Sequence, residues 1–339
     1  MSLNYLITGG AGFIGSNYVQ RLLERGEKVA IYDNLSRTTR NIEWLRQTFG
    51  EKSFNVIVGD VRDASLITES AKSSDVIVHL AGQVAVTTSV INPRDDFESN
   101  AMGTFNVLEA ARLSGRNPIF IYASTNKVYG GMDDVALVEE VTRWRYKDLV
   151  NGCPETQPLD FHSPYGCSKG SGDQYVRDYA RIYGLRTVVY RQSCIYGPRQ
   201  FGIEDQGWLA WFMIAAVMGR AITIYGDGKQ VRDILHVDDL LDAYDAAVAR
   251  IDDVKGKVYN LGGGHQNVIS VWAEFFPMLE KLLGKKIKVE RGDWRPGDQR
   301  VFYADIRKAE KELGWKPKFA VEEGVKKLFE WVSKNKELF

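Results

Sequence analysis

A glycine-rich turn near the start of the chain constrains the fold more than any other feature of the sequence. Gly9, Gly12 and Gly15 lie between an apolar run at 3–8 and a helix-like stretch at 13–25. Glycines in this setting allow a tight strand-to-helix turn and let the backbone approach a pyrophosphate closely. The N–H groups of the helix N-terminus then face that anion. The turn therefore predicts a strand, a helix and a dinucleotide site where they meet.

Strand-like and helix-like segments continue to alternate after this turn, which indicates βαβ units and a parallel sheet. We expect an α/β fold, with a Rossmann-type doubly wound parallel sheet and a smaller C-terminal α/β lobe. Further strands are expected at 28–33, 56–59, 76–80, 118–123 and 186–191, a long helix within 91–114 and another at 165–183. The C-terminal part is expected to hold a turn at 225–229, a strand at 230–236, and helices near 268–283, 305–313 and 320–335. The predicted domains are 1–195 and 196–339, interleaved and with a soft boundary.

Composition excludes several classes of protein. The 339 residues contain 44 Lys plus Arg and 44 Asp plus Glu, so the chain lacks the basic excess of a nucleic-acid binder. The sequence contains no run of 18 apolar residues, so we expect no membrane span, and the N-terminus carries no signal-peptide pattern. Three scattered cysteines favour a reducing cytoplasm, and four histidines far apart in sequence predict no metal site.

Two acidic residues are candidates for the adenosine end of a dinucleotide. Asp33 ends the strand at 28–33, near the spacing expected for an acid that binds ribose hydroxyls. A carboxylate there repels a 2′-phosphate and so favours NAD over NADP. Asp60, with Val61, follows the next strand and either contacts adenine or caps a helix; the sequence leaves both open.

Tyr165 and Lys169 are candidates for acid–base chemistry. A four-residue spacing places both on one face of the predicted helix. Half-ionising a phenol at neutral pH requires stabilising the phenolate by about 4 kcal/mol, which a nearby ammonium and a positive nicotinamide ring can supply. Thr125 follows the strand at 118–123 and is the candidate for orienting a substrate hydroxyl. An isolated Tyr-x-x-x-Lys is usually a surface pair, but the glycine turn and Thr125 favour catalysis.

Ordered motifs along essentially the whole chain resemble the extended short-chain dehydrogenase/reductase family, whose members act on nucleotide-diphosphate sugars. The motifs are Gly9-x-x-Gly12-x-x-Gly15, His79-Leu80-Ala81-Gly82, Asn100-x-x-Gly103-Thr104, Val128-Tyr129-Gly130, Tyr165-x-x-x-Lys169, Tyr196-Gly197-Pro198-Arg199, Val231-Arg232-Asp233 and Arg295-Pro296-Gly297-Asp298.

This resemblance implies a retained NAD in the N-terminal domain and a sugar nucleotide bound by the C-terminal lobe. The implied cofactor contacts are Gly9, Gly12, Phe13, Ile14, Gly15, Asp33, Asn34, Asp60, Val61, Leu80, Ala81, Gly82, Gln83, Asn100, Tyr165 and Lys169. The implied substrate contacts are Gln83, Thr125, Asn126, Arg199, Arg232 and Arg295, with Arg232 and Arg295 binding the diphosphate. Relatives pair through the helices that contain Asn100 and Tyr165, which implies a homodimer or homotetramer.

The residues after Thr125 separate the reactions of this family. Its 4,6-dehydratases carry Asp-Glu there, to supply the acid and base that eliminate water. This chain has Asn126 and Lys127 instead. An amide cannot replace the acid and a lysine is a poor base, so the sequence disfavours dehydration and leaves epimerisation.

Longer stretches at 79–89, 124–130, 159–169 and 199–208 resemble one group within the family, the CDP-paratose (CDP-tyvelose) 2-epimerases. Cys194 and a long segment between 129 and 165 depart from the wider family and agree with that group. The implied enzyme is an isomerase of lipopolysaccharide O-antigen biosynthesis. In the implied mechanism, Tyr165 removes the proton of the C2 hydroxyl while hydride leaves C2 for NAD. The 2-keto sugar then turns, the hydride returns to its other face, and Tyr165 returns the proton.

Alternatives remain at this stage. The first is a UDP-hexose 4-epimerase; a 4,6-dehydratase and a non-catalytic NAD-binding protein are less favoured. The dideoxy sugar of a CDP-paratose 2-epimerase would suit an apolar pocket wall, for which Val86, Trp208 and Trp211 are candidates. Ordinary core packing is the competing interpretation, and for Trp211 the preferred one.

Overall fold

A seven-stranded sheet organises the first of two structural units. The computed structural model describes residues 2–294 and 298–339. One unit comprises the chain up to 128 with 163–191 and 241–259, and the other comprises 129–162, 192–240 and the chain from 260 onward. The assignment of 1–195 to NAD and 196–339 to the nucleotide sugar stays a prediction.

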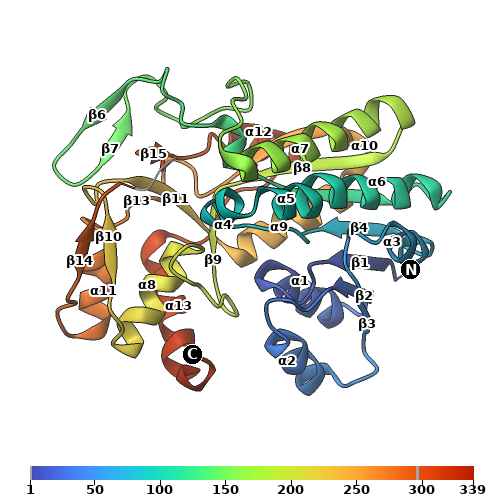
Figure 1. The fold of residues 1–339 in the computed structure, drawn as a ribbon, viewed down its shortest axis with the longest axis horizontal. Helices are drawn as coiled ribbons and strands as arrows, with labels where there is room; N and C mark the ends of the chain where they lie inside the picture. The colour runs from blue at the N-terminus through green and yellow to red at the C-terminus, as the bar shows by residue number, and fades with distance from the viewer. Residues whose placement is uncertain (1, 295–297) are drawn as a thin grey trace. The chain divides into compact units, whose positions relative to one another are not determined.

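Across the sheet of the first unit the strand order is β12-β8-β5-β4-β1-β2-β3 (Figure 1). The strands are β1 (Asn4–Thr8), β2 (Lys28–Asp33), β3 (Asn55–Val58), β4 (Val76–His79), β5 (Ile119–Thr125), β8 (Arg186–Gln192) and β12 (Lys257–Leu261). The pairs β1–β2, β1–β4, β2–β3 and β4–β5 are parallel. The chain order reverses between β1 and β4, and ligands of such sheets bind beyond the carboxyl ends of the strands at that point.

Helices cover both faces of this sheet (Figure 1). They are α1 (Phe13–Glu24), α2 (Arg40–Phe49), α3 (Ala64–Ala71), α4 (Val86–Ile91), α5 (Pro93–Phe97), α6 (Gly103–Leu113), α7 (Ser163–Tyr183), α9 (Val237–Ala249) and α10 (Ile251–Val254). On one face α1 packs on α9, where Tyr18 lies edge-on to Tyr244 and Arg21 pairs with Asp242. On the other face α3, α6 and α7 pack on the sheet through a buried apolar cluster that includes Val107 and Val176.

The doubly wound α/β sheet predicted from the sequence is confirmed, and all six predicted strands of this region are present. The long helix expected within 91–114 is present without a break from 93 to 113, but it contains a π-helical turn that the sequence did not predict. It comprises α5, a π-helix at Glu98–Met102, and α6. The strand expected at 118–123 runs on to Thr125, so that the side chain of Thr125 is fixed by the sheet.

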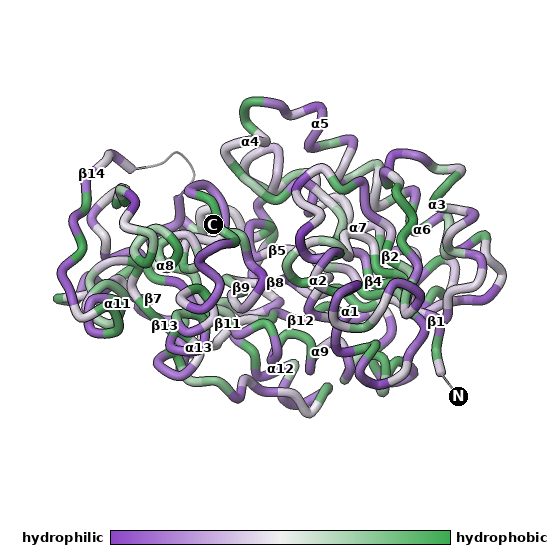
Figure 2. Tube along the Cα trace, turned by 90° about the horizontal axis from the view of Figure 1, so that it is seen from below, coloured by the Kyte–Doolittle hydropathy of each residue, from purple (hydrophilic) through white to green (hydrophobic). Residues whose placement is uncertain are grey.

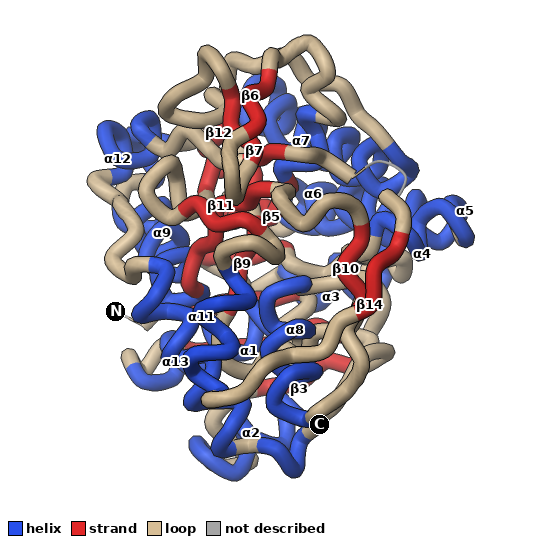
Figure 3. Tube along the Cα trace, turned by 90° about the vertical axis from the view of Figure 1, so that its left-hand side faces the viewer, coloured by secondary structure: helices blue, strands red, loops and turns tan. Residues whose placement is uncertain are grey.

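The second unit contains shorter strands and a helical core. Its strands are β6 (Leu137–Glu139), β7 (Trp144–Tyr146), β9 (Cys194–Tyr196), β10 (Thr223–Tyr225), β11 (Val231–His236), β13 (Val268–Ser270), β14 (Glu290–Gly292) and β15 (Val301–Phe302). Its helices are α8 (Trp208–Met218), α11 (Phe275–Leu283), α12 (Arg307–Leu313) and α13 (Val321–Lys334), with a short 3₁₀ turn at Lys336–Leu338. Strands β10 and β14 pair in parallel (Figure 3).

The core of the second unit is built around α8. Every residue of α8 is apolar, and most of the helix is coloured as hydrophobic in Figure 2. A helix that is apolar all round is stable only when it is surrounded. Here α8 is buried together with residues of α11 and α13, including Phe276 and Leu328.

Two predictions for this part of the chain have different outcomes. The predicted turn is confirmed, because Gly226 and Gly228 adopt φ angles of +73° and +77°, which side chains rarely allow. The predicted helix near 268–283 is wrong at its start, where Val268–Ser270 forms β13 and pairs antiparallel with β11. No helix in the described ranges 2–294 and 298–339 is both long and apolar enough to cross a membrane.

Candidate active site

The glycine turn brings the loops after β1 and β4 into contact. Gly9 has a φ angle of +71°, and a Cβ atom there would lie 2.7 Å from the backbone nitrogen of Ala81. A Cβ on Gly15 would lie 2.4 Å from the carbonyl oxygen of Gly9. The predicted turn thus needs glycine at both positions, because any side chain would push backbone against backbone.

Helix α1 starts inside this turn. Gly12 is its N-cap and no side chain caps it, so the first turn, with Phe13 and Ile14, presents its N–H groups outward. These groups and the positive end of the helix dipole lie where the strand order reverses, between β1 and β4. The arrangement is suited to binding a diphosphate.

The carboxylate of Asp33 supports the glycine turn directly. Its Oδ2 accepts a hydrogen bond of 3.0 Å from the N–H of Ala11, and its Oδ1 accepts one of 2.9 Å from Leu35. Burial raises the pKa of Asp33, and these two bonds oppose that effect. A carboxylate has about four acceptor positions, so two remain for ribose hydroxyls. Asp33 can therefore hold the turn and a ribose together.

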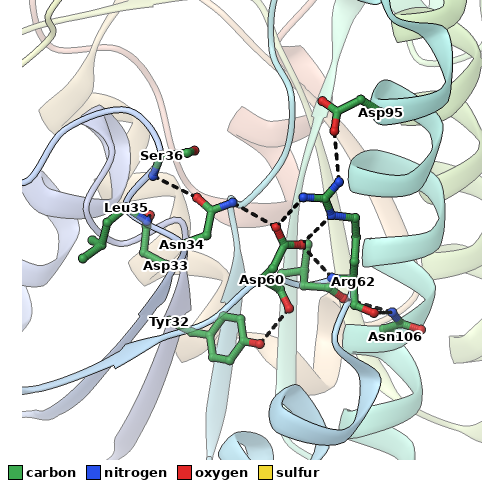
Figure 4. Close-up of polar contacts among 10 residues, drawn as sticks. Tyr32, Asp33, Asn34, Leu35, Ser36, Asp60, Arg62, Asp95 and Asn106 are labelled. Carbon is green, nitrogen blue, oxygen red and sulfur yellow. Dashed lines mark hydrogen bonds and ion pairs between the residues drawn. The ribbon is translucent and has the colours of Figure 1, made fainter.

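The carboxylate of Asp60 forms an ion pair with Arg62 and does not cap a helix (Figure 4). Arg62 donates to both carboxylate oxygens at 2.9 and 2.7 Å, and the Nδ2 of Asn34 donates to Oδ2 at 3.0 Å. The Arg62 guanidinium keeps the pKa of Asp60 well below its ordinary value. The helix-cap interpretation is wrong for Asp60, because the cap of α3 is Asp63, which accepts from Ser65 and Leu66.

Residues between β4 and α4 complete this edge of the sheet. The hydroxyl of Thr8 accepts weak hydrogen bonds from the N–H groups of Leu80 and Ala81 at 3.2 and 3.3 Å. Val61 is buried in the apolar core under α3 and α6. The side chain of Gln83 folds back on Ala85, with two bonds of 2.6 Å. In this arrangement the Gln83 amide fixes its own loop.

Asn100 lies in the π-helix with one of its polar atoms unsatisfied. Its Nδ2 is within hydrogen-bond distance of the Gln83 carbonyl oxygen, at 3.0 Å. Its Oδ1 is buried and has no hydrogen-bond partner among the described residues. A Cβ on Gly82 would lie 2.4 Å from that oxygen, so Gly82 leaves the space that Asn100 occupies. A buried acceptor without a donor, beside the glycine turn, fits a bound ligand that supplies one.

The acid–base pair predicted from sequence is buried on α7. Tyr165 and Lys169 are 9% and 6% exposed. Thr125, at the end of β5, forms a side-chain hydrogen bond with Tyr165, so the structure brings these two candidates together. The Nζ of Lys169 lies 4.3 Å from the centre of the Tyr122 ring, a cation–π distance. Asn126 is also buried, and its Oδ1 lies 3.4 Å from the hydroxyl of Thr125.

Without the positive nicotinamide ring, burial keeps the phenol of Tyr165 in its protonated form near neutral pH. Burial raises the pKa of Tyr165 to about 12, and the hydrogen bond with Thr125 only partly opposes it. Burial also lowers the pKa of Lys169 to about 7, against the charges of Asp173 and Asp96. Desolvation therefore disfavours both charged forms, and the sequence pattern alone could not show how dry the site is.

Two of the arginines predicted to bind substrate are buried in the second unit. Arg232, on β11, is buried and donates to Asp298 at 2.7 Å and to the Val231 carbonyl at 2.7 Å. Arg199 is buried with a φ angle of +63°, unusual for a residue with a side chain. Arg295 lies outside the described residues.

The candidates for an apolar pocket wall have different surroundings. Trp208 lies edge-on to Phe275 and its indole N–H donates to the sulfur of Cys194, and Trp211 packs on the same core of the second unit. Both tryptophans contribute to core packing, as expected for Trp211. Val86, at the start of α4 in the first unit, is half-buried.

Sequence reasoning missed several buried polar residues around Lys169. Asp96 is fully buried and accepts hydrogen bonds from Ser168 and Asn100. Asp173 is fully buried and paired with Arg191. Their positions carried a signal, because Asp96 lies four residues before Asn100 and Asp173 four residues after Lys169, the spacing of neighbours on a helix.

Comparisons with known proteins agree with this geometry. A family model described as GDP-mannose 4,6 dehydratase matches residues 6–328. The chain is 44% identical to CDP-paratose 2-epimerase of Salmonella typhi, over 98% of this chain and 99% of that protein. A solved UDP-glucose 4-epimerase of Thermotoga maritima, with UDP-glucose, matches at a TM-score of 0.84 and 32% identity, covering 98% and 99% of the two chains. A dTDP-glucose 4,6-dehydratase of Streptomyces venezuelae, with NAD and TYD bound, matches at 0.85 and 28%, covering 99% of each.

Proposed function

Because the chain belongs to the GDP-mannose 4,6-dehydratase family of NAD-dependent nucleotide-sugar epimerases and dehydratases, we propose that it is a nucleotide-sugar epimerase, specifically a CDP-paratose (CDP-tyvelose) 2-epimerase. The observation that carries this proposal is the buried set of Thr125, Tyr165 and Lys169 next to a glycine turn. The 44% identity over nearly the full length supports the 2-epimerase as the specific reaction.

The residues of the first unit fit NAD. The glycine turn and the N-terminus of α1 suit the pyrophosphate, Asp33 the adenosine ribose, and the unsatisfied oxygen of Asn100 a donor from the ligand. The carboxylate of Asp60, with Asn34, lies at the end of β3, where adenine would lie. Bound NAD supplies a hydride acceptor that can return the hydride to the opposite face of the sugar.

The chain's own residues move the proton. Thr125 holds the oxygen of the reacting hydroxyl, and Tyr165 removes its proton and later gives it back. Lys169, as an ammonium one helical turn away, stabilises the phenolate form of Tyr165. Burial of all three side chains excludes water, which strengthens these interactions.

We assign Arg199, Arg232 and Arg295 to the nucleotide diphosphate of the substrate. One guanidinium group can donate two parallel hydrogen bonds to the oxygens of a phosphate. Such a strong anchor at the diphosphate lets the weakly held sugar turn while the nucleotide stays bound. The present partner of Arg232, Asp298, would be exchanged for phosphate. A cytoplasmic location, a homo-oligomer and a role in O-antigen biosynthesis stay predictions from the sequence.

A substrate panel tests the proposed reaction. We expect purified protein without added NAD to interconvert CDP-paratose and CDP-tyvelose, followed by proton NMR, and to leave UDP-glucose unchanged. Conversion of UDP-glucose to UDP-galactose instead would make the chain a 4-epimerase, the alternative that the Thermotoga maritima structure keeps open. Loss of water to a 4-keto-6-deoxy sugar would make it a dehydratase.

Replacing Gly15 by alanine tests the cofactor site. The added Cβ would meet the Gly9 carbonyl oxygen at 2.4 Å, and neither backbone can move without opening the turn. We expect the variant to lose its bound NAD, measured in the supernatant after denaturation, and to lose turnover with it.

Gly26→Ala is the matched control for Gly15→Ala. Gly26 follows the other end of α1 at a φ of +74°, and a Cβ there meets nothing within 4 Å. Alanine at Gly26 meets the backbone strain of a positive φ, which Gly15 does not have, but makes no clash with the turn. Full NAD content in Gly15→Ala, or an equal loss in Gly26→Ala, would contradict the assigned site.

A further inference from the structure

A buried carboxylate that the proposed reaction does not use lies next to the acid–base pair. Asp96, on α5, is completely buried. Its Oδ2 accepts a hydrogen bond of 2.5 Å from the hydroxyl of Ser168, and its Oδ1 accepts one of 3.1 Å from the Nδ2 of Asn100. Ser168 immediately precedes Lys169 on α7. The carboxylate is thus fixed against the turn of helix that carries the lysine.

The buried ammonium of Lys169 needs a counter-charge, since an unpaired charge in an apolar interior is costly. Two carboxylates, Asp173 and Asp96, raise the pKa of Lys169 against the effect of burial. Asp173 has the larger effect of the two, but its charge is shared with Arg191, which donates to both of its oxygens at 2.9 and 3.0 Å. Asp96 has only neutral donors, a hydroxyl and an amide, among the described residues. Its charge therefore remains available to the ammonium.

Within the part of the chain that the structure describes, the other groups around Lys169 do not supply a further negative charge. His79, on β4, bonds to Thr8 and Thr104, and burial and the charge of Lys169 lower its pKa to about 3, so it is neutral. The Tyr122 ring of β5 offers Lys169 only its π-electrons. Asp95, next to Asp96 on α5, points to Arg62 at 3.0 Å (Figure 4).

The π-helix explains why Asp96 can be held in this place. Asn100 lies four residues after Asp96, and its Nδ2 is within reach of Asp96, Ser168 and the Gln83 carbonyl, at 3.1, 3.2 and 3.0 Å. A π-helical turn inside a longer helix often marks a functional position. One amide therefore connects the buried carboxylate to α7 and to the loop after β4.

We propose that Asp96 is a positioning residue whose buried carboxylate, fixed beside the helical turn that carries Lys169, keeps that lysine in its ammonium form. The inference rests on the proposed function, in which that ammonium assists the phenol. The same negative charge raises the pKa of Tyr165 and so opposes formation of the phenolate, whereas the ammonium that Asp96 maintains on Lys169 favours it.

The direct test is the titration of Lys169 in Asp96→Asn, which removes the charge and preserves the shape. Protein labelled with ¹³C at lysine Cε shows each lysine by NMR, and the Lys169 signal is identified by its absence in Lys169→Arg. We expect the midpoint of Lys169 to fall by about one pH unit in Asp96→Asn. An unchanged midpoint would overturn the proposal.

Glu98→Gln is the matched control for this titration. Glu98 starts the π-helix that follows α5, but it is more exposed than Asp96 and pairs with Arg94 on the surface. Its loss is expected to leave the Lys169 midpoint in place, and an equal shift there would overturn the proposal. If Asp96→Asn does not fold, Asp96→Ser removes the same charge and retains an acceptor for Asn100, with the same expected shift.

The kinetic readout separates this role from simple packing. A fall of one unit in the midpoint of Lys169 lowers the ammonium fraction, and hence kcat, by up to about tenfold at pH values above the midpoint, and kcat recovers at lower pH. A loss that is equal at every pH would mean a structural role only. If the wild type converts none of the sugars, the proposed function fails while the NMR titration still tests Asp96.

Discussion

Replacing Tyr165 by phenylalanine is expected to lower kcat by about 10²–10⁴-fold, the usual contribution of a positioned proton-transfer group. The phenol is buried and bonded to Thr125, and phenylalanine keeps its shape, so only the transferable proton is lost. Turnover is measured by proton NMR on the CDP sugars. Bound NAD and the circular dichroism spectrum are expected to be those of the wild type.

Tyr183→Phe provides the control on the same helix. Tyr183 is the last residue of α7 and is 53% exposed, so its hydroxyl has no place in the proposed chemistry. We expect full turnover in this variant. Substantial turnover in Tyr165→Phe would assign the proton transfer to another group and contradict the mechanism.

Replacing Arg191 by methionine is expected to destabilise the fold by about 3–5 kcal/mol, because it leaves the buried charge of Asp173 without its partner. The two side chains are 3% and 0% exposed and joined by two hydrogen bonds. Asp173 also accepts a bond of 2.8 Å from Ser124, which precedes Thr125. Urea unfolding followed by circular dichroism measures the loss.

Two further variants test the cause of this loss. Arg112→Met breaks a doubly bonded pair with Glu109 at the surface, where ion pairs contribute little, and we expect no marked change. Arg191→Met combined with Asp173→Leu removes both charges, so it is expected to recover part of the stability. A single Arg191→Met variant as stable as the wild type would contradict the view that Asp173 remains charged.

The sequence predicted the parts of the fold that local chemistry determines. The strands of the sheet up to β8 were found because each is a short apolar run, and the turn after β1 because only glycine fits there. Helix α8 was missed because it is apolar on every side and shows no helical period. Strand β13 was read as the start of a helix because its three residues have no period of their own, and only pairing with β11 defines it.

The candidate site was predicted in its identities more than in its electrostatics. Spacing placed Tyr165 and Lys169 on one helix face, and Thr125 was a candidate because it follows a predicted strand. The structure brings Thr125 to Tyr165. The directions of the pKa shifts of Tyr165 and Lys169 depend on burial, which comes from the packing of α7 against β5, α4 and α5 and is not encoded by spacing. Asp96 was missed for the same reason, since its role depends on the absence of an arginine partner, a fact of three-dimensional structure.

The measurement that tests the central account most directly uses a CDP sugar carrying deuterium at C2, incubated in ordinary water with protein and no added NAD. The hydrogen at C2 leaves as hydride and returns to the same carbon within one site. We therefore predict that the epimerised product retains its deuterium at C2, seen by mass spectrometry and NMR. Loss of the label to solvent would show that C2 exchanges a proton instead, and would contradict a hydride mechanism built on Tyr165, Lys169 and bound NAD.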